Sequence, residues 1–251
     1  MIEAVTFDWW DTIALTTVEQ DRELRELRID RLLKAVPKLP LIRDELLRAY
    51  DRQQAILEEG WERNVDPAPE EQVRTFLQFA GLDPKDAILA ERVSEAFGGA
   101  LQEAPPNLFP HVRETLEELE RNGIAIGLVS NTGRTWGQYL RRLQDRMGIG
   151  RFFRVRVFSD EVGVRKPLRP IFEAALEALG HPAERAVHVG DDLDADVRGA
   201  KAMGMRAVWF HADRKGYRPR GQARPRESGV QPDAVIDDHA ELPRVLGRWR
   251  D

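Results

Sequence analysis

The chain has 251 residues, a formal net charge of −5 and no cysteine, and 42% of its residues are hydrophobic. The absence of cysteine excludes disulfides, thiolate metal sites and cysteine nucleophiles, and the mild negative charge gives no general attraction to nucleic acid or membranes. Because no apolar run approaches the length of a membrane span and the N-terminus does not resemble a secretory signal, we expect a soluble cytoplasmic protein.

The first predicted element is a strand, because residues 2–7 form a short apolar run rich in strand-forming side chains. Amphipathic helices follow, with apolar residues at helical spacing and prolines at the breaks between them. The predicted helices cover residues 19–36, 41–62, 69–82 and 86–102, and Pro37 and Pro40 mark the first break. Because no strand is indicated between residues 15 and 105, this part of the chain is predicted to be an all-helical block.

After Pro105 and Pro106, apolar strands alternate with amphipathic helices. The predicted strands are residues 124–130, 153–159, 186–190 and 206–210, and one more strand and helix fall within 232–246. This alternation is typical of a doubly wound, parallel α/β sheet of the Rossmann-like kind. We therefore predict a Rossmann-like core formed by residues 1–14 and 106–251, with residues 15–105 inserted as an all-helical domain.

Polar residues follow four of the predicted strands. In a doubly wound sheet the carboxyl ends of the strands lie at one edge, where ligands bind. Carboxylates, a hydroxyl, an amide and one lysine at this edge would suit a hard cation and an oxyanion. The residues concerned are Asp8, Asp11 and Thr12 after the first strand, Ser130, Asn131 and Thr132 after the second, Lys166 after the third, and Asp191, Asp192, Asp194 and Asp196 after the fourth.

The same stretches resemble the four motifs of the haloacid dehalogenase-like (HAD) hydrolase superfamily. One motif alone would be a weak match, whereas four motifs in the right order, each after a predicted strand, form a strong signal. The matching residues are Asp8 and Thr12 in FDWWDT, Ser130 in LVSNTG, Lys166 in VGVRKP, and Asp191 and Asp196 in HVGDDLDADVRGA. The helical insertion resembles the helical cap of one subgroup of this superfamily.

The resemblance implies a hydrolase whose catalytic residues are Asp8, Ser130, Asn131, Lys166 and Asp196. Asp8 would attack the substrate and carry a covalent aspartyl intermediate, which splits the hydrolysis into two easier steps. Ser130 and the backbone near Asn131 would donate hydrogen bonds to the transferring group. Lys166 would neutralise negative charge, and Asp196 would orient Lys166.

The resemblance also implies a Mg²⁺ cofactor. Its ligands would be the carboxylates of Asp8 and Asp191 and the backbone carbonyl of Trp10, because oxygen ligands suit this hard cation. The metal would offset the repulsion between an anionic nucleophile and an anionic phosphate.

The chain departs from the family pattern at Trp10. HAD phosphatases have an acid/base aspartate two residues after the nucleophile, and an indole cannot protonate a leaving alkoxide. The loss of a positioned general acid costs roughly 10²–10⁴-fold in rate. Family members that cleave carbon–halogen bonds also lack this aspartate, whereas the stretch Gly190-Asp191-Asp192 resembles the metal-binding phosphatase form.

Three functions stay open at this point. The leading hypothesis is hydrolysis of a small phosphate ester or acyl phosphate, with no nucleic-acid or membrane partner. The first alternative is a metal-independent 2-haloacid dehalogenase with Asp8 as nucleophile. The second alternative is a degenerate HAD protein that binds a ligand or a partner with little turnover. The substrate and the oligomeric state do not follow from the sequence, because substrate choice depends on cap residues that have no transferable spacing.

The remaining residues have simpler interpretations. We expect Trp9 to pack in the core and Asp194 to be solvated or to cap a helix, and Asp192 fits either a structural or a functional role. His188 lies inside an apolar strand, so we do not expect it to be a ligand. The basic stretch 214–227 is interpreted as a surface loop, because the chain as a whole is acidic.

Overall fold

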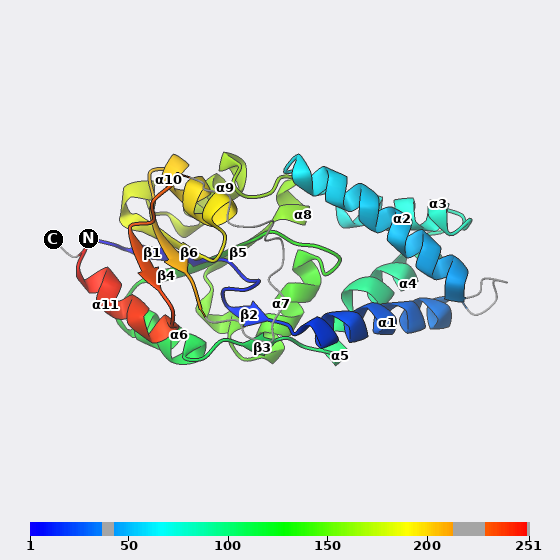
Figure 1. The fold of residues 1–251 in the computed structure, drawn as a ribbon, viewed down its shortest axis with the longest axis horizontal. Helices are drawn as coiled ribbons and strands as arrows, with labels where there is room; N and C mark the ends of the chain where they lie inside the picture. Colours follow the sequence, from blue (N-terminus) through cyan, green and yellow to red (C-terminus); the bar gives the residue numbers. More distant parts are fainter. Residues whose placement is uncertain (37–42, 213–228, 250–251) are drawn as a thin grey trace.

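The computed structural model describes residues 1–36, 43–212 and 229–249. The molecule is elongated, with a sheet-based core at one end and a helical lobe at the other, and both chain termini lie at the core end (Figure 1). Among the described residues, no helix combines the length and the apolar character needed to cross a bilayer.

Six parallel strands form the central sheet in the order β5-β4-β1-β6-β7-β8. The strands are β1 (Ala4–Phe7), β4 (Ala125–Ser130), β5 (Val155–Phe158), β6 (Ala186–Gly190), β7 (Arg206–Phe210) and β8 (Ala234–Ile236). The three central strands are buried along their whole length, which explains why they appear in the sequence as continuous apolar runs. Phe7 lies beside Leu128 of β4 and Val189 of β6, so the residues that follow these strands meet at one edge.

Helices cover both faces of the sheet (Figure 1). On one face, α6 (Val112–Arg121), α7 (Gly137–Arg146) and α11 (Leu242–Gly247) share an apolar cluster with Val5 and Phe7. On the other face, α9 (Arg169–Leu179) and α10 (Gly199–Ala202) pack with Ala4 and Val129. The short helices are α8 (Ser159–Val162) and single turns at Gly150–Phe152, Ala183–Arg185 and His239–Glu241.

The helical lobe is inserted between β2 (Ala14–Leu15) and β3 (Asn107–Leu108), which pair antiparallel where the chain leaves and re-enters the core. Its apolar side chains form a cluster of their own around Phe76 and Phe97, whose rings meet edge to face at 4.9 Å. Trp136, which precedes α7 of the core, is part of this cluster, so the lobe packs directly on the core. The helices are α1 (Val18–Ala35), α2 (Arg43–Glu62), α3 (Pro69–Phe79), α4 (Ala87–Gly98) and α5 (Ala100–Glu103).

The predicted fold class, a doubly wound parallel α/β sheet with a helical insertion, is confirmed. Leu15 differs from the expected all-helical block, because it belongs to β2, a strand too short to leave a periodic pattern. We propose that the helical cap begins and ends at the β2–β3 ribbon, which places its limits near residues 15 and 105. The break at Pro37 and Pro40 and the basic stretch 214–227 lie outside the described residues.

The segment after β6 also differs from the pattern, which indicates a helix from about residue 196. The helix begins at Leu193, as a turn of π-helix (Leu193–Arg198) that continues into α10. Its early start has a local cause, since the Asp192 carboxylate accepts hydrogen bonds from the N–H groups of Asp194 and Ala195 at 2.7 and 2.9 Å. Asp192 is therefore a helix cap.

Candidate active site

Lys166 joins two of the predicted catalytic carboxylates in a buried cluster at the carboxyl edge of the sheet. Its Nζ donates to Oδ1 of Asp8 at 2.6 Å and to Oδ1 of Asp196 at 2.6 Å. All three side chains are buried. The backbone N–H of Asp8 bonds to the carbonyl of Val189 at 2.9 Å, so the sheet itself fixes where this carboxylate leaves β1.

Asn131 holds the backbone of Lys166 in place. Its Oδ1 accepts from the Lys166 N–H at 2.8 Å, and its Nδ2 donates to the Lys166 carbonyl at 3.3 Å. Ser130 is buried at the end of β4, and its hydroxyl makes one long hydrogen bond of 3.4 Å to the carbonyl of Asn131. The loop after β4 therefore positions the lysine.

Carboxylate oxygens of Asp8, Asp191 and Asp196 lie within 4.8 Å of one another, an arrangement that could hold a metal ion. Asp196 is already occupied by protein donors, because its Oδ1 accepts from Lys166 and its Oδ2 accepts from the Asp192 N–H at 3.0 Å. Asp8 and Asp191 are thus the carboxylates of this group that are best placed for a cation. Two hard oxygen donors at a buried site fit Mg²⁺.

The pKa values of the two carboxyl groups bonded to Lys166 shift in opposite directions. Burial raises the pKa of Asp8 to about 7, although the Lys166 ammonium favours its ionised form. Burial also acts on Asp196, yet Lys166 and His188 outweigh it and hold the pKa of this carboxyl well below its usual range. Burial would lower the pKa of Lys166, but the carboxylates of Asp196 and Asp8 raise it. The ionised form of Asp196 is therefore stabilised more strongly than that of Asp8. A divalent cation would favour the ionised form of Asp8.

His188 belongs to this cluster, although the sequence pattern gave no reason to include it. Its Nε2 lies 3.0 Å from Oδ1 of Asp196 and its Nδ1 lies 2.8 Å from the hydroxyl of Thr6 on β1. Because a carboxylate only accepts, Nε2 carries the proton, and burial lowers the pKa of the imidazole. The only sequence feature that could have indicated His188 is its polar side chain inside an apolar strand, two positions before Gly190.

The loop after Asp8 is a tight turn built around two indoles. Trp9 is buried in the core cluster, and its carbonyl accepts the N–H groups of Ile13 and Ala14 at 3.0 and 2.8 Å. The half-buried ring of Trp10 packs against the same cluster, edge-on to Trp9 at 6.2 Å. Asp11 is buried and has a φ of 59°, in the left-handed region that aspartate tolerates better than most residues. Trp9 is thus a packing residue, as its apolar surroundings require.

A residue near the C-terminus also holds this loop in place. His239 is buried, and its ring nitrogen Nε2 donates to the carbonyl of Thr12 at 2.8 Å. Burial lowers the pKa of His239 to about 4, so the imidazole is neutral at pH 7. The Thr12 hydroxyl in turn donates to Oδ1 of Asp191 at 3.5 Å. A residue more than 200 positions away therefore helps to place the first motif, and no local pattern indicates it.

Asp194 has no part in the cluster. Its carboxylate is partly exposed and forms an ion pair with Arg198, one helical turn later, at 2.8 Å. This surface pair agrees with the structural interpretation of Asp194.

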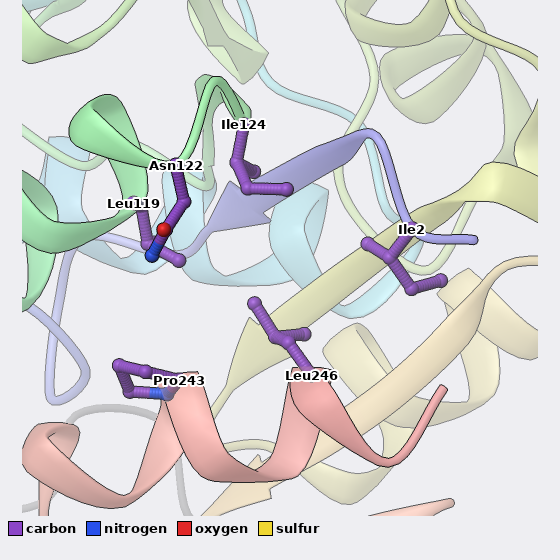
Figure 2. A pocket seen from close by; sticks show the side chains of 6 residues that line it. All are labelled: Ile2, Leu119, Asn122, Ile124, Pro243 and Leu246. Atoms are coloured by element: carbon purple, nitrogen blue, oxygen red, sulfur yellow. The ribbon is translucent and has the colours of Figure 1, made fainter. Parts of the chain in front are cut away.

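A small apolar cavity lies at the opposite edge of the sheet (Figure 2). Its volume is about 20 Å³, enough for one water molecule. Ile2 and Ile124, which line it, precede β1 and β4, so the cavity faces the amino ends of the strands. It is therefore separate from the charged cluster. The remaining lining residues are Leu119, Asn122, Pro243 and Leu246.

A family model for haloacid dehalogenase-like hydrolases matches residues 2–204. The chain belongs to this HAD family. It is 32% identical to a glyceraldehyde 3-phosphate phosphatase of Methanopyrus kandleri over 98% of this chain and 97% of the relative. It is also 30% identical to a phosphoglycolate phosphatase of Pseudomonas savastanoi pv. phaseolicola, over 84% of this chain and 74% of the relative.

Among solved structures, a 2-haloacid dehalogenase from Pseudomonas syringae pv. Tomato superposes with a TM-score of 0.71 at 27% identity, over 99% of this chain and 100% of that one. A HAD phosphatase from Thermococcus onnurineus superposes with a TM-score of 0.60 at 28% identity, over 98% of both chains. The protein is thus a HAD-type hydrolase, and its phosphatase relatives favour phosphatase-like activity over dehalogenation.

Proposed function

We propose that this HAD hydrolase removes phosphate from a small phosphate ester or acyl phosphate, with Mg²⁺ and through a covalent intermediate at Asp8. The observation that carries the proposal is the buried cluster in which Lys166 bonds to both Asp8 and Asp196 while Asp191 lies beside them. Relatives named as phosphatases of glyceraldehyde 3-phosphate, phosphoserine and phosphoglycolate support the same substrate class. We expect this activity in the cytoplasm, as the composition indicates.

In the first step, a carboxylate oxygen of Asp8 attacks phosphorus, and the bond between phosphorus and the leaving oxygen breaks, so that the leaving group departs as an anion with the bonding electron pair. Lys166 stays charged and bonds to Asp8, so its ammonium stabilises negative charge beside the reacting atoms. In the second step, water attacks the aspartyl-phosphate and releases inorganic phosphate and Asp8. The Ser130 hydroxyl and the neighbouring backbone donate to the phosphoryl oxygens in both steps.

Mg²⁺, held by Asp8, Asp191 and the carbonyl of Trp10, would reduce the repulsion between the carboxylate and the phosphate dianion. His188 and Asp196 act at a distance from phosphorus. They keep Lys166 in place through the hydrogen bonds at 3.0 and 2.6 Å to Oδ1 of Asp196.

Dehalogenation of a 2-haloacid is the second candidate function. Here Asp8 would attack carbon, and the halide would leave without a proton, which agrees with an indole at Trp10 in place of an acid. The structural similarity to a 2-haloacid dehalogenase supports this candidate.

One assay separates the two candidates. Phosphate release from p-nitrophenyl phosphate and from a panel of metabolite phosphates is measured with Mg²⁺ and with a chelator, beside chloride release from 2-chloropropionate. We expect phosphate release that needs Mg²⁺ and no chloride release. Metal-independent chloride release would establish the dehalogenase instead.

The Asp8→Asn variant tests the covalent step in the same assay. It should fold normally and lose at least about 10³-fold in turnover, because the amide is not a nucleophile. Asp194→Asn is the matched control, since this exposed carboxylate pairs only with a surface arginine in the described structure. More than a few per cent of wild-type activity in Asp8→Asn would rule out an intermediate at Asp8.

A further inference from the structure

The loop that carries Lys166 is bonded directly to the cap. Residues 64–66, between α2 and α3, pair with residues 163–165 through two backbone hydrogen bonds of 3.0 and 3.3 Å. The residue before the lysine therefore lies at the junction of cap and core. Its position is set by both parts of the molecule.

This residue, Arg165, uses only part of its guanidinium to hold the junction. Its Nη1 donates to Oδ2 of Asp66 at 2.8 Å and to the carbonyl of Thr132 at 2.6 Å. The guanidinium also lies over the ring of Trp61, with its central carbon 4.8 Å from the ring centroid. Within the described residues, Nε and Nη2 of Arg165 have no hydrogen-bond partner, and the side chain is 14% exposed.

Asp66 is a rigid anchor for this arginine. Its side chain is fully buried and accepts hydrogen bonds from Trp61 Nε1 at 3.1 Å, from Thr132 Oγ1 at 3.1 Å and from the hydroxyl of Ser159. The carboxylate is therefore shared among four donors and meets one nitrogen of Arg165. It does not take both nitrogens of the guanidinium fork, as a bidentate pair would.

The charge of the catalytic cluster also acts on the pKa of Arg165. Burial lowers the pKa of this guanidinium, whereas the carboxylates of Asp66 and Asp8 both raise it. The Asp8 carboxylate is thus among the charges that stabilise this guanidinium. Its neighbour Lys166 makes the direct contact with Asp8.

We propose that Arg165 binds a second anionic group of the substrate, a carboxylate or a phosphate, through its Nε and Nη2 edge. The inference rests on the proposed phosphatase function and narrows its substrate class to small phosphate esters that carry another acidic group. Two parallel N–H groups on one edge of a guanidinium match the two oxygens of such a group. Asp66 and Trp61 of the cap would keep this edge oriented, so the cap takes part in specificity through a residue of the core.

Arg134 lies at the same junction and differs from Arg165 in how many of its nitrogens are hydrogen-bonded. It is buried, and its three side-chain nitrogens each donate to a cap acceptor, namely the amide oxygens of Gln54 and Gln53 and the carbonyl of Tyr50. Arg134 thus docks the cap with all of its nitrogens. Arg165 docks the cap with one nitrogen, and its other two face no protein acceptor in the described structure.

The test compares substrates that differ only in the second acidic group. One pair is 2-phosphoglycolate and 2-hydroxyethyl phosphate, and the other is ribulose 1,5-bisphosphate and ribulose 5-phosphate. The measured quantity is the ratio of kcat/KM within each pair, for the wild type, Arg165→Gln and Arg165→Lys. Arg169→Gln is the control, because this exposed arginine lies in the same region and pairs with Glu173 at 3.1 Å.

We expect Arg165→Gln to lower the ratio by about 10–100-fold in the pair whose acidic group is recognised, since a hydrogen bond to a charged group contributes about 1.5–3 kcal/mol. The pair that responds tells a carboxylate from a phosphate. Arg165→Lys should recover only part of the ratio because it lacks the planar fork. A purely structural role would lower both members of each pair alike, and unchanged ratios in both pairs would overturn the inference.

Loss of Arg165 leaves a buried carboxylate at Asp66 without its cation, which can prevent folding. The double variant Arg165→Gln/Asp66→Asn removes both charges and keeps the comparison possible. Calorimetric binding of 2-phosphoglycolate and 2-hydroxyethyl phosphate is measured as well, in the Asp8→Asn background with and without Arg165→Gln. If the wild type hydrolysed no phosphate ester, the proposed function would fail, and this binding difference would still decide the role of Arg165.

Discussion

Trp10 stands two residues after Asp8, where the HAD pattern has an acid/base aspartate. Its ring packs against the apolar core and against Trp9, so the side chain offers no proton to a leaving group. Asp11 follows in a left-handed turn conformation that separates it from the regular strand geometry of β1. We therefore expect the rate of the proposed phosphatase reaction to depend on how stable the leaving group is as an anion.

Replacement of Trp10 tests this dependence. Acyl phosphates and p-nitrophenyl phosphate leave as stable anions, whereas sugar phosphates need a proton, so the wild type should hydrolyse the first group faster by up to about 10²–10⁴-fold. Trp10→Asp should narrow the difference by accelerating the alkyl esters selectively. The comparison uses steady-state rates of the wild type and Trp10→Asp on aryl and alkyl phosphates.

Asp11→Asn is the control for the Trp10 experiment. It should change the aryl and alkyl rates in the same proportion, because its carboxylate is not the proposed acid. Selective loss of alkyl activity in Asp11→Asn, or equal wild-type rates on both classes, would show that the loop supplies its acid from Asp11.

The turn from β6 into the π-helix links the sheet to Lys166, the proposed catalytic lysine. Gly190 ends the strand, and a Cβ built on it would lie 2.2 Å from Cγ of Asp196 and 2.3 Å from its Oδ2. The Asp196 side chain cannot easily give way, because Lys166, His188 and the Asp192 N–H all hold it. The close packing of the Gly190 backbone against the Asp196 carboxylate therefore helps to set the position of Lys166.

Gly190→Ala should therefore move Asp196 and Lys166 and reduce kcat by about 10²-fold, the usual effect of a displacement near 1 Å at a reacting centre. Gly204→Ala is no suitable control because of its positive φ, whereas Gly247 has open space around it and an ordinary backbone conformation. Gly247→Ala should keep full activity. Near-wild-type kcat in a folded Gly190→Ala protein would show that the Asp196 position is not critical.

The proposed Mg²⁺ site would connect two distant parts of the chain at the carboxyl edge of the sheet. The proposed ligands come from the first motif and from the turn after β6, which are more than 180 residues apart in the chain. An ion bound between them would stabilise the folded state and not the unfolded chain.

Mg²⁺ at about 100 times its Kd should raise the free energy of unfolding by about 2.7 kcal/mol and Tm by roughly 5–11 °C. Asp191→Ala should abolish the shift, because it removes one of the two carboxylates proposed to bind the ion. Asp194→Ala should keep the shift. Thermal unfolding with a Mg²⁺ titration measures both, and an undiminished shift in Asp191→Ala would place the ion elsewhere.

The sheet, the helical insertion and the set of polar residues at the strand ends could all be predicted from the amino-acid sequence. Buried parallel strands leave continuous apolar runs, and the carboxyl ends of parallel strands share one edge. The proximity of Asp8, Lys166, Asp191 and Asp196 therefore follows from their positions after the predicted strands.

The other residues that support this edge become evident only from contacts in the folded chain. His188, His239 and Arg165 act through partners that lie 8, 227 and 99 positions away in the chain, on other elements or across the cap junction. Such contacts depend on how helices and loops pack in three dimensions, and side-chain packing leaves no periodic signal in the sequence. For the same reason, the sequence did not indicate that the side-chain amide of Asn131 holds the backbone of Lys166 through both its oxygen and its nitrogen.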